Sequence, residues 1–364
     1  MINLDDKKTI LKIQGGEEVL KSIDKLPQQL EQAFEESQKV DFPESFAKVE
    51  NILVCGMGGS RFPALILKDL FKKELKVPLL INDDYLLPNF VNEKTLLILS
   101  SYSGTTEEVI TNFYQAKEKK AKITAITSGG EIAKIIKDNH LPGYVFAPIY
   151  NPSQQPRIGF GYNVGGLLGI LAKLELLKFK KEKIIRAINS LPQLTNNFKV
   201  DIPLKDNSAK DLAIKIFNKY PYYIVSEFLT GWGNALANQT NETAKTISTF
   251  RVIPELNHHL MEGLKHPGEI KNLLIFVFFF SHLYSPVIQK RFQITKEVVE
   301  KNNIKTLWVK LKGENAIEQV FYAMSLGSYL TMYLSVLYQE NPSIIPFVDY
   351  FKKRLKDTRL DNLI

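Results

Sequence analysis

The 364-residue sequence contains a single cysteine, Cys55, and only five histidines. One cysteine cannot form an internal disulfide bond or supply a cysteine-cluster metal site, which favours a reducing compartment. The N-terminus also lacks the apolar run and small-residue cleavage pattern of a signal peptide, because Asp5 and Asp6 precede any apolar stretch. We therefore expect a cytoplasmic protein that is not exported.

Long apolar runs are scarce as well. Residues 319–339 form one uncharged stretch that is long enough to span a bilayer, but serines, a threonine and four tyrosines interrupt it. This pattern favours a buried or subunit-interface helix, so we expect no membrane segment. A helix of this kind would be costly to leave in water, which is an argument for a dimer.

Charge of one sign is not strongly dominant. Lys and Arg number 47 against 39 Asp and Glu, which gives a formal net charge of +8, and 45% of residues are hydrophobic. Such a chain folds into one large or two ordinary globular cores. The modest positive charge favours an anionic partner, but by itself it does not distinguish nucleic acid from a phosphorylated metabolite.

Strand-like and helix-like segments alternate along most of the chain, after an amphipathic N-terminal arm at residues 17–39. Apolar strand candidates lie at residues 51–55, 77–81, 95–100, 122–127 and 144–147, and again at 222–226, 249–252, 273–279 and 305–309. This alternation predicts α/β architecture with parallel sheets covered by helices on both faces. A segment rich in Pro, Asn and Asp at residues 191–207 indicates a linker, so we predict two domains, at residues 1–195 and 205–364.

Two strand-to-helix turns have the composition of phosphate-binding sites. The first follows residues 51–55 and contains Gly58, Gly59 and Ser60. Glycines there would let backbone N–H groups and a helix N-terminus face an anion. Its spacing matches neither a dinucleotide fingerprint nor a nucleotide P-loop, and an ordinary tight turn is the alternative interpretation.

The second turn, SSYSGTTEE at residues 100–108, contains more hydroxyl groups than helix capping needs, among them Ser101, Ser103 and Thr106. In an open parallel sheet, ligands bind at the carboxyl ends of strands, where both turns would lie. Because neither turn contains lysine, neutral hydroxyls and amides would bind the ligand. This suits a small sugar phosphate better than a triphosphate with its metal ion.

Further motifs point to a family. The segments GMGGS, SYSGTTEE, PRIGFGY, NETAK, ELNHH and NPSIIPFVDYFKKRL occur in that order, at residues 56–60, 101–108, 156–162, 241–245, 255–259 and 341–355. From about residue 45 to its end, the chain resembles the bifunctional phosphoglucose/phosphomannose isomerase family. The resemblance implies two sugar isomerase (SIS) domains, each a parallel sheet flanked by helices. It also implies a homodimer with shared active sites and no cofactor or metal.

The resemblance also implies roles for individual residues. Glu242 resembles the base that moves a proton between C1 and C2 through a cis-enediol, and Arg157 the cation that stabilises the enediolate. His258 resembles the ring-opening residue supplied by the neighbouring subunit, and Lys352 a lysine that assists it. Because His259 follows His258 and Lys353 follows Lys352, it stays open which histidine and which lysine have these roles. The hydroxyls that resemble the phosphate ligands are those of Ser60, Ser101, Ser103 and Thr106.

Elementary chemistry is consistent with these roles. Moving a proton between adjacent carbons needs a carboxylate, a proton donor for the ring oxygen and a cation beside the developing oxyanion. Without the motifs, Glu242 and Lys352 would be ordinary solvated helix residues, and Arg157 could merely pair with an acid.

We expect a glucose 6-phosphate/fructose 6-phosphate isomerase that does not bind nucleic acid. Ser343 and Ile345 lie near where a threonine of the family is linked with mannose 6-phosphate, so acceptance of that substrate stays open. The alternatives are another sugar-phosphate isomerase and a non-catalytic SIS sensor of phosphosugars. A sensor would need no base and would carry a helix-turn-helix extension, which the N-terminal arm lacks.

Overall fold

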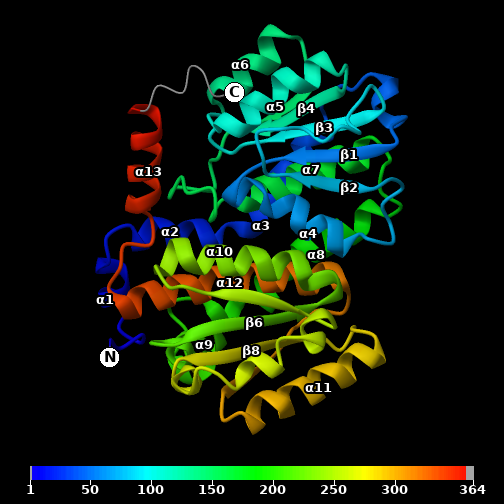
Figure 1. The fold of residues 1–364 in the computed structure, drawn as a ribbon. Helices are drawn as coiled ribbons and strands as arrows, with labels where there is room; N and C mark the ends of the chain where they lie inside the picture. The colour runs from blue at the N-terminus through cyan, green and yellow to red at the C-terminus, as the bar shows by residue number, and fades with distance from the viewer. Residues whose placement is uncertain (1, 358–364) are drawn as a thin grey trace.

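The computed structural model describes residues 2–357, which form two parallel sheets with helices packed around and between them (Figure 1). The first sheet has the order β2-β1-β3-β4-β5. Its strands are β1 (Asn51–Cys55), β2 (Leu79–Asn82), β3 (Thr95–Ser100), β4 (Lys122–Thr127) and β5 (Gly143–Val145). All of its pairings are parallel, as the alternation of segments predicts.

Helices cover both faces of the first sheet. Alternate residues of β1 point to opposite faces: Leu53 packs in a cluster with residues of α5 (Glu107–Glu118) and α6 (Gly130–Asp138). Ile52 packs in the larger cluster, which contains residues of α4 (Phe62–Leu70) and α7 (Phe160–Lys173). The near-continuous apolar character of the strands follows from burial on both sides.

The N-terminal arm is part of this packing. Helices α2 (Gly16–Asp24) and α3 (Leu26–Ser37) confirm the amphipathic arm predicted at residues 17–39, and α1 (Lys7–Lys12) precedes them. Helix α3 lies against α7, and a Cβ at Gly165 of α7 would come within 2.5 Å of the Leu30 carbonyl oxygen. Glycine on α7 therefore allows the two backbones to approach closely.

The second sheet has the order β7-β6-β8-β9 and is also parallel. Its strands are β6 (Tyr220–Ser226), β7 (Thr249–Ile253), β8 (Leu274–Phe280) and β9 (Lys305–Lys310). Helix α11 (Pro286–Lys301) covers one face, and α10 (Thr230–Ala244) lies across the other (Figure 1). The predicted two-sheet α/β fold is confirmed.

The uncharged stretch forms α12 (Ala316–Tyr338), which lies at the centre of the molecule and contacts helices of both halves. By length and composition α12 is the one helix of residues 2–357 that could cross a membrane, yet its most apolar window is 100% buried inside the protein. The alternative of a subunit-interface helix is wrong, because the chain's own helices cover α12. Its apolar surface therefore gives no argument for a dimer.

The segment predicted as a linker is more ordered than its composition suggests. Helix α8 (Lys181–Leu194) extends into it, and two 3₁₀ turns follow before α9 (Ser208–Ile216). Phe198 is fully buried, and its carbonyl oxygen accepts a hydrogen bond from the Tyr333 hydroxyl at 2.6 Å. Pro192 lies inside α8, Pro203 precedes the second 3₁₀ turn, and the Asn207 side chain caps α9, so these residues are part of ordered structure that packs on the core.

Candidate active site

The first glycine-rich turn leaves the end of β1 and continues through a 3₁₀ turn, Gly58–Ser60, into α4. Gly59 packs on the loop before α7, since a Cβ there would lie 3.0 Å from the Arg157 backbone nitrogen. Gly58 has a left-handed φ of 49° and faces open space. The buried Ser60 hydroxyl accepts a hydrogen bond from the Tyr102 backbone N–H at 2.8 Å.

The second turn follows β3 and ends at the first residue of α5. The buried Ser101 hydroxyl lies 2.8 Å from the Thr106 hydroxyl and accepts from the Gly104 N–H at 3.0 Å. Ser103 is exposed. Thr106 is the N-cap of α5, but its side chain makes no capping hydrogen bond. Hydroxyl groups and the positive end of a helix dipole therefore face the same region.

These two turns are neighbours, as the sequence predicts. β1 and β3 pair directly, and the hydrogen bond between Tyr102 and Ser60 joins the turns that follow them. A Cβ at Gly104, which has a φ of 69°, would come within 1.8 Å of the Gly129 carbonyl oxygen. Only glycine lets the second turn pack so closely on the turn after β4.

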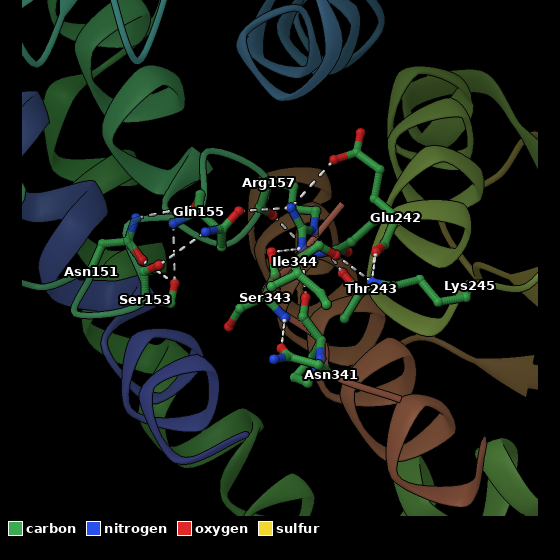
Figure 2. Close-up of polar contacts among 12 residues, drawn as sticks. Asn151, Ser153, Gln155, Arg157, Glu242, Thr243, Lys245, Asn341, Ser343 and Ile344 are labelled. Carbon is green, nitrogen blue, oxygen red and sulfur yellow. Dashed lines mark hydrogen bonds and ion pairs between the residues drawn. The ribbon is translucent and has the colours of Figure 1, made fainter. Parts of the chain in front are cut away.

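Arg157 is the most connected side chain of the site and is 1% exposed (Figure 2). Its guanidinium donates five hydrogen bonds: from Nε to Thr243 Oγ1 (3.1 Å), from Nη1 to Gln155 Oε1 (3.0 Å) and Glu242 Oε2 (3.4 Å), and from Nη2 to the carbonyl oxygens of Pro342 (2.5 Å) and Ser343 (2.8 Å). Burial lowers the pKa of Arg157, and the charges of Glu242 and Asp349 oppose that shift.

Glu242 lies near the end of α10, and its side chain is 29% exposed. Its carboxylate meets the guanidinium, while the next residue, Thr243, binds Nε of the same group. Gln239, one turn earlier, donates to the Arg157 backbone carbonyl at 3.0 Å. Helix α10 therefore holds both the backbone and the side chain of Arg157, and leaves the carboxylate of Glu242 partly open to solvent.

Sequence reasoning missed Lys245, although it lies in the NETAK motif. Its Nζ donates to the carbonyl oxygens of Glu242 (2.6 Å) and Ile344 (2.7 Å). Burial and the neighbouring Arg157 lower the pKa of Lys245 to about 8. Gln155 and Thr243, the side-chain partners of Arg157, were missed as well, because nothing in the sequence ties them to an arginine.

The two histidines lie in another loop. His258 ends the 3₁₀ helix Glu255–His258 that follows β7, and its side chain is exposed. His259 Nε2 lies 2.7 Å from Glu255 Oε1 on the same exposed surface. Within residues 2–357 no hydrogen bond or ion pair joins either histidine to Glu242.

Lys352 lies on α13 (Pro346–Asp357), which projects beside the first sheet and its helices (Figure 1). Both Lys352 and Lys353 are exposed. The start of the helix is close enough for the Asp349 charge to act on Arg157. The described part of the chain therefore brings Arg157 and Glu242 together and keeps Lys352 at the surface.

Residue types that could bind a metal do not cluster in the part of the chain that the structure describes. Among residues 2–357, no group of three or more His, Cys, Asp or Glu side chains could hold a metal ion. Cys55, beside the first turn, is fully buried in β1, and burial raises the pKa of its thiol.

Comparison with known proteins identifies the family. Residues 45–135 match the SIS domain, and residues 205–355 match the bacterial phospho-glucose isomerase C-terminal SIS domain. A bifunctional phosphoglucose/phosphomannose isomerase of Caldicellulosiruptor bescii is 30% identical over 348 residues, covering 94% of this chain and 100% of that protein. The chain belongs to the bifunctional phosphoglucose/phosphomannose isomerase family. The resemblance noted from the motifs is confirmed.

Other matches agree with this family. A bifunctional phosphoglucose/phosphomannose isomerase of Thermoplasma volcanium is 29% identical over 87% of this chain and 96% of that protein. A solved structure of a Thermus thermophilus protein described as hypothetical covers 97% of this chain and 93% of its own, with a TM-score of 0.74 and 14% identity. At that identity it supports the fold alone.

The two matched ranges contain different parts of the candidate site. The SIS range contains both hydroxyl-rich turns, and the C-terminal range contains Glu242, His258 and Lys352. Arg157 lies between the two ranges and contacts both parts of the site. As a member of this family, the chain is a sugar-phosphate aldose–ketose isomerase.

Proposed function

We propose that this protein interconverts glucose 6-phosphate and fructose 6-phosphate through a cis-enediol. The observation that carries the proposal is the position of Arg157, whose backbone packs on Gly59 of the first turn while its side chain meets the carboxylate of Glu242. A sugar phosphate held by the turns would thus have its reacting carbons near a partly exposed carboxylate and a fixed positive charge.

The phosphate end of the substrate is assigned to the two turns. Ser60, Ser101, Ser103 and Thr106 would bind phosphate oxygens together with the first backbone N–H groups of α5. Hydrogen bonds to a charged phosphate are stronger than those between neutral groups, so hydroxyls and amides suffice without lysine. Gly58 and Gly59 would let the backbone approach the anion closely.

The proton transfer is assigned to Glu242. Its carboxylate would take the proton from C2 of the open-chain aldose while the carbonyl oxygen at C1 gains a proton, which gives the enediol. The 2-hydroxyl then loses its proton to water, and Glu242 delivers a proton to C1, which gives the ketose. Because the Glu242 side chain is 29% exposed, the proton that it carries can exchange with solvent before delivery. Arg157 would stabilise the negative charge on the enediolate.

We assign ring opening to His258 from the neighbouring subunit, assisted by Lys352, in a cytoplasmic homodimer with shared active sites. Two observations support a partner: His258 is exposed, and α13 leaves Phe347 88% exposed, with Phe351 exposed beside it. Apolar side chains of this size on one helix are costly to leave in water.

The test is a solvent-exchange assay. Fructose 6-phosphate incubated with the protein in heavy water is expected to give glucose 6-phosphate with deuterium at C2. Glu242→Gln keeps the shape of the side chain but cannot accept the proton, so turnover is expected to fall about 10²–10⁴-fold with little change in phosphosugar binding. Phosphosugar binding without isomerisation by the wild-type protein would instead favour a sensor.

The same assay, run with mannose 6-phosphate, tests the second activity. The curated relatives are named for both sugars, and we propose that this protein also accepts mannose 6-phosphate. Fructose 6-phosphate formation from the mannose substrate would support this, and its absence beside full activity on glucose 6-phosphate would restrict the protein to one sugar.

A further inference from the structure

The segment between α12 and α13 is held by two cations. We call residues 341–344 the C-terminal strap. Three successive strap carbonyl oxygens accept hydrogen bonds from Arg157 or Lys245, namely those of Pro342, Ser343 and Ile344 (Figure 2). The strap runs directly into α13, so its position sets where that helix begins.

Lys245 joins this strap to the helix that carries the base. It is the C-cap of α10, in a left-handed conformation with φ of 54°. From there its Nζ reaches both the carbonyl oxygen of Glu242 and that of Ile344, at 2.6 and 2.7 Å. One ammonium group therefore binds the peptide of the proposed base and the end of the strap.

The surroundings of Lys245 disfavour its charged form. Burial and the nearby Arg157 disfavour the charged ammonium, while Glu340 and Glu242 favour it. An ordinary surface lysine extends its amine into water and avoids such a penalty. Here the amine turns inward to two carbonyl oxygens, which offset the loss of water.

We propose that Lys245 is a positioning residue that fixes Glu242 and the start of α13 relative to each other. The inference rests on the proposed function, because it concerns the alignment of the base and of the helix that bears Lys352. It requires no contact between Lys245 and the substrate. A simpler role, capping the last turn of α10, would affect stability but would not affect turnover selectively.

The test compares Lys245→Met, Lys245→Arg and a control, Lys219→Met. Lys219 also donates from Nζ to a carbonyl oxygen, that of Asn272 at 2.7 Å, but on the exposed surface of the second domain. Lys245→Met is expected to lower kcat about 10- to 100-fold with KM changed less than about threefold, since misalignment affects the chemical step and the phosphate turns stay intact.

Arginine can donate to both carbonyl oxygens, so Lys245→Arg is expected to recover kcat to within about threefold of wild type, and Lys219→Met to stay within about twofold. Wild-type kcat in Lys245→Met, or equal changes in kcat and KM, would overturn the proposal. If Lys245→Met does not fold, Lys245→Gln replaces it, and an unchanged kcat in that variant overturns the proposal equally.

Hydrogen exchange separates this proposal from the proposed function. The Ser343 backbone N–H donates to Asn341 Oδ1 at 2.8 Å, so it reports on strap order. In Lys245→Met, the backbone amides of residues 341–350, other than the prolines at 342 and 346, are expected to exchange about tenfold faster, with those of β1 and β3 unchanged. An inactive wild-type protein would refute the proposed function while this readout still reports on Lys245. Unchanged exchange would refute the positioning role.

Discussion

Replacing Arg157 with lysine keeps a positive charge in the buried centre of the site but removes donors. The guanidinium donates to five acceptors, and an ammonium has three N–H groups. At least two acceptors therefore lose their partner in Arg157→Lys. A lysine ammonium that kept the bonds to the Pro342 and Ser343 carbonyl oxygens would have one N–H left for the three remaining acceptors.

The expected loss of stability follows from this count. A buried acceptor left without a donor costs about 1–3 kcal/mol, so two cost about 2–6 kcal/mol. We take about 2–4 kcal/mol, because Ser343 and Glu242 are partly open to water and recover some of the loss there. Unfolding entropy is about 2.1 cal/mol/K per residue, or about 0.8 kcal/mol/K for 364 residues, so Tm should fall by about 3–5 °C.

Calorimetry measures the fall in Tm of Arg157→Lys, and the isomerase assay measures its kcat. The matched control is Arg251→Lys in β7, where Nη1 alone binds Thr249 Oγ1 and the Phe250 carbonyl oxygen, so an ammonium can replace both bonds. Arg251→Lys is expected to change Tm by about 1 °C or less. If Arg157→Lys lowers Tm no more than this control and retains wild-type kcat, the structural reasoning about the guanidinium is refuted.

Two other predictions concern the subunit partner and pH. Inactive Glu242→Gln and His258→Asn proteins, unfolded and refolded together, are expected to recover about a quarter of wild-type activity. About half of the dimers are then mixed, and each mixed dimer has one intact site of two. No recovery would exclude active sites that are shared between subunits. Burial lowers the pKa of Lys245 to about 8 from 10.5, so the unfolded chain binds more protons between those values. Below pH 8 this penalty to the folded state is fully present. From pH 8 to 10.5 the unfolding free energy of wild type should therefore rise relative to Lys245→Met, and a parallel pH dependence in denaturant titrations would contradict the assignment.

Local patterns in the sequence were sufficient to predict the two sheets. Apolar segments such as residues 51–55 and 95–100 are buried on both faces, so their composition alone indicates parallel strands, and the observed β1 and β3 have those bounds. The glycine and hydroxyl turns were predicted for a related reason. Their residues are needed where the chain turns, so the signal lies within a few positions of each strand end.

Contacts between distant segments could not be predicted in this way. Arg157 binds carbonyl oxygens 185 and 186 positions later, and backbone carbonyls carry no sequence signal. The motifs marked Arg157 and Glu242 as functional, yet neither spacing nor periodicity indicated that they form an ion pair. Lys245 was missed for the same reason, because its role depends on where the strap passes.

The burial of α12 changes how a dimer is argued. Its uncharged sequence indicated either a buried or a subunit-interface helix, and α2, α4, α8, α9 and α10 cover it within one chain. The exposed apolar residues that support the proposed homodimer, Phe347 and Phe351, lie instead on α13. Arg157 adjoins the turn after β1, Glu242 lies on α10 beside the second sheet, and the strap between α12 and α13 accepts hydrogen bonds from Arg157. In the proposed function neither half of the chain contains the site alone, so the packing of α10, α12 and the strap between the halves would be part of the catalytic geometry.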